Sequence, residues 1–421
     1  MPDTLPYFIQ DLAGIGGTLK QRPEDFVVHE MPAYEASGAG EHVMLEIEKT
    51  AISTFEAIDT LARRLKVPRR DIGYAGLKDT RAVTRQWLTV RGVDLMAVSE
   101  AATDKLKILF ADKHGNKLRV GHLRGNRFTI KVRDVDPMRV VTLTPALRTL
   151  SERGMPNYFG PQRFGRRDRN DELGLAYAKG DADGVLAQLL GRPDDGDNEA
   201  ERAARMAYDA GDLSAAAKLW PHHARDELTT LNRLIRTRDA VVVVAGIDRR
   251  LTGLWLSALQ SRLFNTVVAR RIDAIDGLLE GDIAFKHENG ASFAVADAAI
   301  ERPRVEVFDI SVTGPLIGPR MMRPQGAARD VERAALADCG LEHSGLMRLY
   351  DGEDGDDVRA LASQLPPGAR RPLRVRPDDL RAESGIDEHG PYIAVSFALP
   401  AGSYATVLLR ELMRNDAVAT D

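Results

Sequence analysis

The pattern of the chain changes twice along its length, and this change limits the possible folds more than any other feature. Residues 18–132 contain several strand-like segments, and residues 395–399 alternate as a strand again near the end. The stretch from 171 to about 363 carries helix-like segments instead. With 421 residues, the chain is also too long for one compact core. We therefore expect an α+β protein in which a mainly helical domain interrupts a domain built on a sheet.

The middle part of the chain, from residue 171 to about 363, is predicted to hold six helices and one turn-rich connection. Its expected helices lie near 171–179, 183–190, 199–210, 213–220, 226–237 and 253–272. The last of these has an apolar stripe that leaves Gln260, Arg262 and Asn265 outside it, so we expect these side chains in solvent. Residues 309–318 include Thr-Gly-Pro-Leu and read as a turn-rich connection. Residues 241–244, four valines, form the longest β-like apolar run.

Two elements are predicted in the early part of the chain. Residues 43–47 alternate between apolar positions and others, which is typical of a half-buried strand. Ser53 and Glu56 have the spacing of a capping box, so a helix is expected to begin there and to run to about Leu65. A glycine-containing loop follows this helix.

That loop, residues 73–86, has the clearest chemical content of the chain. Gly73 and Gly76 permit a tight backbone path, which can present Lys78 and Asp79 at a fixed angle. Asp79 could instead cap a short helix, and Lys78 could be a solvated surface charge. However, residues 63–91 hold nine basic side chains and only two acidic ones. A nearly lone carboxylate among cations suits a polyanionic substrate, and the nearby positive charge should keep it ionised.

Two further segments have either a structural role or a role in binding nucleic acid. Asn126 stands beside a glycine at the entrance of a predicted strand, where it is a turn residue or an amide that reads the edge of a base. Phe128, in the same strand, is a core residue or a stacking platform for a flipped base. Residues 156–165 hold three aromatic residues and Arg163, a composition typical of an interdomain hinge or a nucleic-acid clamp.

Composition narrows the class of protein. The single cysteine, Cys339, excludes an internal disulfide framework and a cysteine metal cluster, and it favours a reducing cytosol. No apolar run approaches the ~20 residues of a membrane span, and the first residues do not read as a signal peptide. We therefore expect a cytoplasmic protein. The net charge of −4 argues weakly against a promiscuous nucleic-acid binder but not against a selective one.

Several common chemistries lack their sequence motifs. There is no P-loop, and the glycines of residues 14–17 lack the spacing of a dinucleotide fingerprint. Neither His-Glu-x-x-His nor Gly-x-Ser-x-Gly is present. The remaining groups are a carboxylate, a lysine, aromatic residues and arginines. They suit chemistry on a nucleic-acid base without a metal or cofactor, in which the carboxylate acts as nucleophile or base.

Five segments in order along nearly the whole chain resemble the TruD family of tRNA pseudouridine synthases. The matching residues are Lys20, Pro23-Glu24-Asp25-Phe26, Val28 and Glu30; Gly76-Leu77-Lys78-Asp79 with Ala82, Thr84 and Gln86; Gly125-Asn126-Arg127-Phe128; Pro156-Asn157-Tyr158-Phe159-Gly160 with Gln162-Arg163-Phe164-Gly165; and Leu399-Pro400 with Gly402-Ser403-Tyr404-Ala405-Thr406.

The resemblance implies isomerisation of uridine to pseudouridine in tRNA, at position 13 of the D-arm. It implies a pseudouridine-synthase catalytic domain with a mixed, largely antiparallel sheet (1–155 and 366–421), interrupted by an inserted helical TRUD domain (156–365). No cofactor and no obligate protein partner are implied. The implied site consists of Asp79 as the catalytic aspartate, Asn126 and Phe128 at the target base, and Lys20 and Glu30 along the site. From their charge we also expect Lys78 to bind the substrate and four arginines to contact RNA phosphates: Arg69, Arg70, Arg81 and Arg163.

Two other functions remain open at this point. One is a catalytically idle tRNA-binding or RNA-folding protein of the same fold. The other is a hydrolase that uses Asp79 on a nucleoside or sugar, which would release free uracil.

Overall fold

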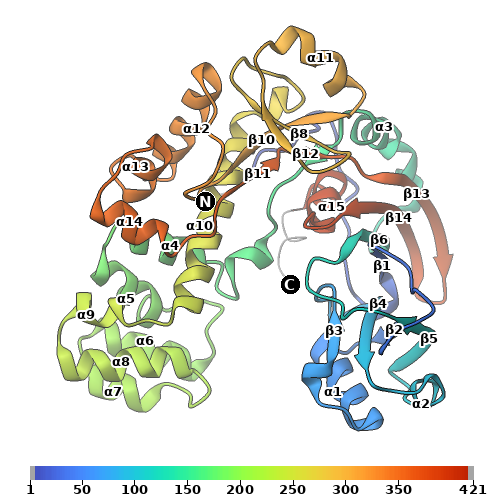
Figure 1. Ribbon diagram of the computed structural model, residues 1–421, viewed down its shortest axis with the longest axis horizontal. Helices are drawn as coiled ribbons and strands as arrows, with labels where there is room; N and C mark the ends of the chain where they lie inside the picture. Colours follow the sequence, from blue (N-terminus) through green and yellow to red (C-terminus); the bar gives the residue numbers. More distant parts are fainter. Residues whose placement is uncertain (1–4, 416–421) are drawn as a thin grey trace. The chain divides into compact units, whose positions relative to one another are not determined.

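The computed structural model describes residues 5–415. This part of the chain divides into two compact units (Figure 1). Residues 8–155 and 375–415 form the first, which we call the sheet unit, and residues 5–7 and 156–374 form the second, which we call the helical unit. The predicted α+β class is confirmed. No helix of the described residues is long and apolar enough to cross a membrane.

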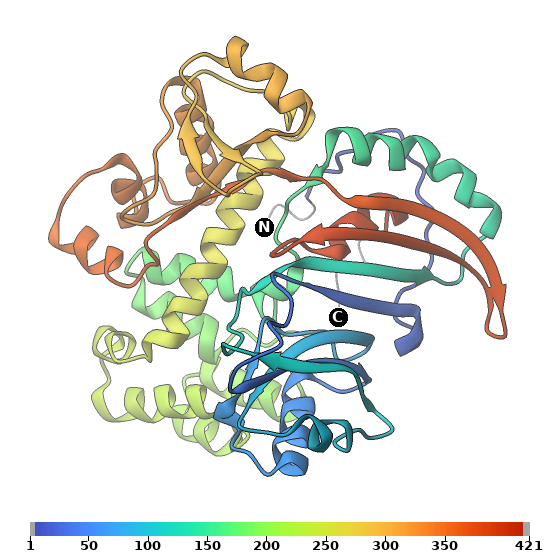
Figure 2. The same cartoon turned by 45° about the vertical axis from the view of Figure 1, so that its right-hand side comes forward.

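The sheet unit is built on eight strands in the order β13-β14-β6-β1-β4-β2-β5, with β3 paired to β4. The strands are β1 (Phe26–Pro32), β2 (His42–Thr50), β3 (Ile72–Tyr74), β4 (Val83–Arg91), β5 (Leu106–His114), β6 (Leu123–Val132), β13 (Asp378–Asp387) and β14 (Gly390–Pro400). The helices are α1 (Thr54–Leu65), α2 (Leu95–Ser99), α3 (Thr144–Arg153) and α15 (Ala405–Met413). Figure 2 shows the long β13–β14 hairpin at one side of the sheet.

One edge of β4 is shared by two short partners. β1 pairs with it in parallel through Val27–His29, opposite 83–85. β3 pairs with it in antiparallel fashion through Ile72–Tyr74, opposite 88–90. The other edge of β4 is covered along its length by β2. Gln86 and Trp87 therefore lie between the two pairings, at a position where the sheet has no strand partner on that edge.

The core of this unit lies between the sheet and α1. The predicted capping box at Ser53 and Glu56 is present and starts α1. Below the helix, Val43, Leu45 and Ile47 of β2 are buried together with Leu88 of β4. These positions alternate along their strands, so one face of the sheet carries the apolar contacts.

The two ends of the sheet unit are joined by a buried carboxylate. Glu411 of α15 is 1% exposed and accepts hydrogen bonds from the backbone N–H of Phe8 at 3.0 Å and of Ile9 at 3.3 Å. β14, which precedes this helix, lies between β13 and β6. Residues near the end of the described chain are therefore required for the interior of the sheet unit.

The helical unit contains a four-stranded sheet of order β11-β10-β8-β9 and most of the helices. Its strands are β8 (Ile283–Lys286), β9 (Ser292–Ala294), β10 (Ile310–Leu316) and β11 (Ala369–Pro372). Its helices are α4 (Asn170–Ala178), α5 (Ala182–Leu190), α6 (Glu199–Asp209), α7 (Leu213–Leu219), α8 (Arg225–Thr237), α9 (Ala240–Ala245), α10 (Arg249–Arg270), α11 (Ala298–Glu306), α12 (Gly326–Asp338), α13 (Gly345–Asp351) and α14 (Asp356–Ala362). The short strands β7 (Met155–Pro156) and β12 (Arg374–Val375) pair with each other.

The long helix α10 corrects one expectation. Gln260 is 5% exposed and Asn265 is fully buried, so the prediction that they are solvated was wrong. Arg262 is also largely buried and pairs with Asp171 at 3.3 Å. The reason is that α10 contacts α4, α12 and β10, which cover more of it than the single apolar stripe indicates.

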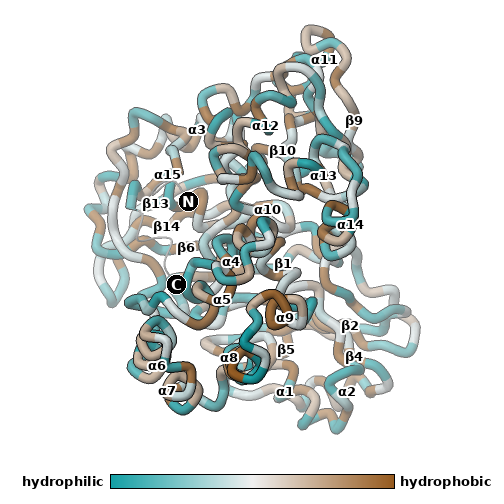
Figure 3. The backbone as a smooth tube through the Cα atoms, turned by 90° about the vertical axis from the view of Figure 1, so that its left-hand side faces the viewer, coloured by the Kyte–Doolittle hydropathy of each residue, from teal (hydrophilic) through white to brown (hydrophobic). Residues whose placement is uncertain are grey.

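Two other local predictions were wrong for a similar reason. Residues 310–316 form the central strand β10 and not a turn-rich connection, because β8 and β11 pair with both of its edges. The valine run forms the short helix α9, which is coloured as hydrophobic in Figure 3. The Asp239 carboxylate caps this helix by accepting from Val241 N and Val242 N. Burial of Val243 and Val244 against α5 and α8 outweighs the β propensity of valine.

Candidate active site

The loop of residues 75–82 joins β3 to β4 and carries Lys78 and Asp79. Cross-strand pairing places several polar residues on the sheet face that carries the core. Lys49, Thr84, Val28, Phe128 and Phe397 form one row across five strands. The next row contains Ile47, Gln86, Glu30, Asn126 and Leu399. The apolar face is thus interrupted by a polar region.

Glu30 repairs the gap on the edge of β4. Its side chain is fully buried, and its Oε1 accepts a hydrogen bond from Trp87 N at 3.2 Å. The carboxylate thereby replaces the missing strand partner. The other oxygen, Oε2, forms an ion pair with the ammonium of Lys78, a residue whose side chain is 5% exposed. Burial raises the pKa of Glu30, and the Lys78 ammonium opposes that rise. The Lys78 side chain is therefore buried against β1, where its ion pair with Glu30 fixes the loop to the sheet.

Asp79 lies close to a second lysine. Lys20 Nζ is 3.2 Å from Asp79 Oδ1, and it also lies 4.7 Å from the centre of the Phe26 ring. The Lys20 backbone has φ of 53°, a left-handed conformation that is uncommon for a residue with a side chain. The Asp79 side chain is 28% exposed, so it remains accessible from solvent.

Lys49 is a residue of this site that the sequence interpretation missed. Its side chain is fully buried, and its ammonium donates to the backbone oxygens of Asp79 at 2.8 Å and Ile52 at 2.7 Å. Burial lowers the pKa of Lys49 to about 8, and the Asp79 carboxylate opposes the change. A signal was present in the sequence, because Lys49 continues the alternation of the buried positions 43, 45 and 47.

Two uncharged side chains complete the support of the loop. Thr54, at the start of α1, accepts from Lys78 N at 3.0 Å and donates to Gln86 Oε1 at 3.1 Å. Gln86 Nε2 in turn donates to the carbonyl of Gly76 at 2.6 Å. Residues of α1, β1, β2 and β4 therefore all hold the short segment that presents Asp79.

Asn126 and Phe128 lie in this region of the sheet, beside Glu30. Asn126 is opposite Glu30 in the β1–β6 register, and its buried Oδ1 has no hydrogen-bond partner among the described residues. Phe128 is 6% exposed and stacks on Phe397, with ring centres 5.2 Å apart. Phe26 also contacts the Phe128 ring in an edge arrangement, with ring centres 6.4 Å apart, so Phe128 is packed between two aromatic residues.

Among the predicted RNA-binding arginines of the sheet unit, Arg81 lies in this loop, and Arg69 and Arg70 precede β3. Arg69 pairs with Asp59 at 2.8 Å, whereas Arg70 and Arg81 are exposed and make no ion pair within the described chain. Arg163 belongs to the helical unit, where its guanidinium donates to the hydroxyls of Ser257 and Ser261. These contacts give Arg163 a role in holding residues 161–164 against α10.

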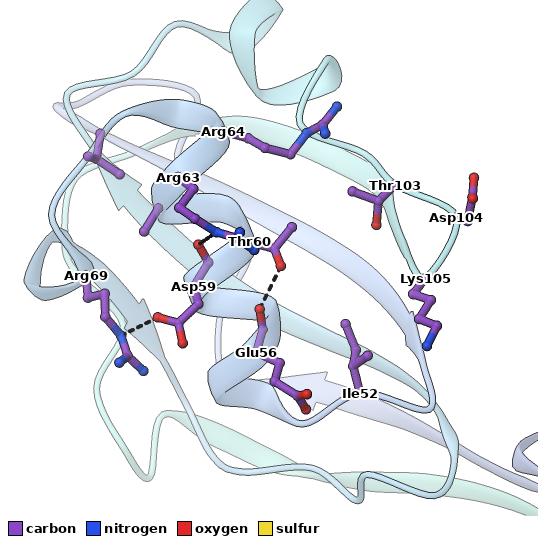
Figure 4. Close-up of a pocket in the computed structure, with 12 residues that line it drawn as sticks. Ile52, Glu56, Asp59, Thr60, Arg63, Arg64, Arg69, Thr103, Asp104 and Lys105 are labelled. Atoms are coloured by element: carbon purple, nitrogen blue, oxygen red, sulfur yellow. Dashed lines mark hydrogen bonds and ion pairs between the residues drawn. The ribbon is translucent and has the colours of Figure 1, made fainter.

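A separate groove of about 1130 Å³ runs beside α1 (Figure 4). Arg63, Arg64 and Arg69 line it from the side of the helix, and Lys105 lies across from them. Three carboxylates also line the groove: Glu56, Asp59 and Asp104. The groove is therefore lined by both positive and negative charges, even though three of its arginines belong to the basic stretch of residues 63–91.

The arrangement around Asp79 offers a solvent-accessible carboxylate on a rigidly held loop and an unpartnered amide oxygen on the neighbouring sheet face. No group of three or more His, Cys, Asp or Glu side chains within residues 5–415 is placed to hold a metal ion. The groups present can supply a nucleophile or base and can orient a planar ligand with a hydrogen-bonding edge.

Comparison with known proteins gives a consistent result. Residues 4–412 match the family described as tRNA pseudouridine synthase D (TruD). The tRNA pseudouridine synthase D of Geotalea daltonii is 41% identical over 411 residues, which cover 97% of this chain and all of the relative. That of Geobacter metallireducens is 42% identical over 409 residues and covers 97% of each chain.

The same relationship is seen in three dimensions. The crystal structure of a presumed tRNA pseudouridine synthase D (TruD) from Methanosarcina mazei matches with a TM-score of 0.83 and 26% identity, covering 97% of this chain and 96% of that one. Because sequence and fold agree over nearly the whole length, this chain belongs to the TruD family of tRNA pseudouridine synthases, isomerases that act on tRNA.

Proposed function

We propose that this chain converts uridine to pseudouridine at position 13 in the D-arm of tRNA, with Asp79 as the catalytic residue and without a cofactor. The observation that carries the proposal is the placement of Asp79. Its carboxylate is accessible, contacts Lys20, and lies on a loop held by Lys49, Thr54 and Glu30 through Lys78. Rigid support of this kind is what a group needs to meet a reacting atom in fixed geometry.

The proposed reaction conserves all atoms. The bond between ribose C1′ and uracil N1 breaks, the ring rotates, and C1′ joins C5; C5 then loses its proton, and N1 gains one. Asp79 takes part by attacking C1′ or by removing the C2′ proton, which gives a glycal. Both routes place the carboxylate at the ribose. Direct detection of a glycal would distinguish them.

The target base has to leave its stack, which costs a few kcal/mol. In this proposal the Phe128 ring stacks on the uracil and contributes about 1–3 kcal/mol. The unpartnered Asn126 Oδ1, or its amide N–H after rotation, meets the edge of the base. Lys20 and Glu30 are proposed to line the same site, and Lys78 acts through its ion pair with Glu30.

The sheet unit is the catalytic domain in this proposal, and the helical unit corresponds to the inserted TRUD domain. Arg69, Arg70, Arg81 and Arg163 are proposed to contact tRNA phosphates, with Arg70 and Arg81 the most available because they are exposed and unpaired in the described chain. A tRNA-modifying role places the protein with its substrate in the cytoplasm.

The decisive experiment is tritium release from tRNA labelled with [5-³H]uridine. Wild type should release tritium, and Asp79→Asn should release none while still binding tRNA. Asp71→Asn is the matched control, because Asp71 is the other carboxylate between residues 63 and 91 and its side chain makes no hydrogen bond or ion pair within the described chain. Appreciable turnover by Asp79→Asn would refute the assigned role.

The same assay separates the other functions. Tight binding without product from any tRNA would establish the RNA-binding protein, and free uracil in place of pseudouridine would establish the hydrolase. Carbodiimide modification followed by primer extension maps the product, because the copied strand ends one nucleotide before the modified base, and a modified base anywhere except position 13 would contradict the proposed site.

A further inference from the structure

A small pocket of about 310 Å³ lies beside the connection from β5 to β6 in the sheet unit. Its lining consists of Tyr34, His114, Asn116, Lys117, Arg119 and His122. None of these residues takes part in the support of Asp79 described above. The pocket thus combines three aromatic rings with two cations and an amide. These groups suit a ligand that is both planar and anionic.

The aromatic side chains of this pocket are held in place by one another. Tyr34 stacks on His114 with ring centres 5.2 Å apart and an angle of 11° between the planes. Its hydroxyl is 2.8 Å from His122 Nδ1. His114 is 8% exposed, and its Nδ1 has no hydrogen-bond partner among the described residues. A buried, unpartnered polar atom in a pocket wall indicates a missing partner.

The charge of the pocket differs from that of the groove beside α1. Lys117 and Arg119 line it, and no carboxylate does. The Lys117 ammonium binds the carbonyl of Arg70, which does not neutralise its charge. Arg119 is exposed, and its side chain makes no hydrogen bond or ion pair within the described chain. An anion therefore fits this pocket better than the larger groove, where three carboxylates line the wall.

The pocket is attached to the hairpin that carries Asp79. Gly121 N donates to the carbonyl of Ala75 at 2.8 Å, at the beginning of the loop. Leu118 N donates to Thr89 Oγ1 of β4 at 2.9 Å. Gly73 of β3 allows this close approach, because a Cβ there would lie 2.5 Å from the carbonyl oxygen of Leu118. A ligand in the pocket would therefore have a fixed position relative to the loop.

We propose that this pocket binds a nucleotide of the tRNA substrate other than the target uridine. Lys117 and Arg119 meet its phosphate, the rings of Tyr34 and His122 contact its base, and Asn116 and His114 reach the polar edge of that base. The inference rests on the proposed function, because it takes tRNA as the substrate. It adds a second anchoring point, which sets how the RNA is oriented when the target uridine approaches Asp79.

The test uses the full chain and a full-length, unmodified tRNA transcript, with Kd measured by fluorescence anisotropy at several salt concentrations. Arg119→Gln should raise Kd several-fold and lower the slope of log K against log salt by about 0.7–0.9, which corresponds to one phosphate. Tyr34→Leu should raise Kd by roughly 5-fold or more because stacking is lost. The matched control is Arg148→Gln, an exposed arginine of α3 that pairs with Glu152.

The outcomes of this test are distinct. The inference is overturned if Arg119→Gln binds like Arg148→Gln, and also if Arg119→Gln weakens binding while Tyr34→Leu does not, since that indicates a backbone contact without a base. If Tyr34→Leu does not fold, His122→Leu replaces it, because the proposal also places the His122 ring against the base, so its loss should likewise raise Kd. Wild type that binds tRNA but forms no pseudouridine refutes the proposed function and leaves this binding test valid.

Discussion

Asn265 of α10 and Asn126 of β6 place an amide inside two different units in opposite ways. Asn265 uses both ends of its side chain: Oδ1 accepts from Phe159 N at 2.8 Å, and Nδ2 donates to Phe159 O at 3.0 Å. Asn126 has a buried Oδ1 with no partner in the described chain. The same residue type therefore serves as a structural clamp in one unit and as an open contact in the other.

The surroundings follow the same division. Near Asn265, Gln260 Nε2 also binds a backbone carbonyl, that of Ile317. Near Asn126, Thr84 Oγ1 is another buried oxygen that lacks a partner among the described residues. A polar group whose bonds are all made stabilises its own fold, whereas one left unpaired costs stability unless a ligand arrives. Asn126 Oδ1 and Thr84 Oγ1 therefore remain open to a hydrogen bond from a ligand, whereas the amides of Asn265 and Gln260 do not need one.

Glu30 provides the largest expected effect, because it is the one carboxylate of the site that is also part of the sheet. Glu30→Gln removes the partner of the buried Lys78 ammonium and should lower the free energy of unfolding by about 3–5 kcal/mol. Urea unfolding measures the loss. The double variant Glu30→Gln/Lys78→Met should recover part of it. A single variant as stable as wild type would show that the pair is not structural.

Asn265→Ala tests the clamp directly. It leaves the N–H and carbonyl of Phe159 buried and unpaired, so we expect a loss of about 2–4 kcal/mol. Hydrogen exchange of the α10 amides measures this loss, and their protection should be lower in the variant than in wild type. Unchanged protection of these amides would mean that the backbone around Phe159 finds other partners.

Lys49 adds a pH dependence to the sheet unit. Below pH 8 both the folded and the unfolded chain carry its proton, and the folded chain bears the full cost of burying the charge. Between about 8 and the ordinary value of 10.5, only the unfolded chain keeps the proton, so stability rises with pH by up to about 1.4 kcal/mol per pH unit.

Comparison with Lys49→Met isolates this effect. The melting temperature of wild type, relative to that of the variant, should rise from pH 7.5 to pH 9.5. Parallel curves over that range would contradict the lowered pKa of Lys49.

Asn126→Ala should have the smallest effect on stability and so completes the comparison. Because Oδ1 makes no hydrogen bond in the described chain, its removal should change the free energy of unfolding by less than about 1 kcal/mol. The value of kcat/KM for tRNA should fall by about tenfold or more if the amide holds the base. A large loss of stability without a change in kcat/KM would make Asn126 structural, like Asn265.

The sequence was most informative where a local rule and the tertiary structure agree. The alternation of residues 43–47 and the capping box at Ser53 and Glu56 predicted β2 and the start of α1 correctly. The loop with Lys78 and Asp79 was identified because glycines and charges stand out locally. Lys49 was missed because a lysine in a strand reads as solvated until its partner across the fold is known.

The remaining errors arise from contacts between elements far apart in sequence. A one-sided helix pattern predicts a one-sided helix, but α10 is covered by three elements, which buries Gln260 and Asn265. Glu30 was associated with the site only by resemblance, since no local pattern shows that β1 and β3 would leave a gap opposite Trp87. The environment of these residues depends on how strands and helices far apart in sequence pair and pack, and local patterns in a single sequence do not reveal that arrangement.

The position of β14 has a consequence for how the protein is made. Synthesis on the ribosome delivers residues 156–374, which form nearly all of the helical unit, before it delivers the strand between β6 and β13 or Glu411. The sheet unit, most of which is synthesised before residue 156, is therefore completed last, and its incomplete sheet leaves the edge of β6 unpaired until β14 emerges. Limited proteolysis of ribosome-stalled chains should show a protected helical unit once residue 374 has left the exit tunnel, with the sheet unit still cleavable until the final helix emerges.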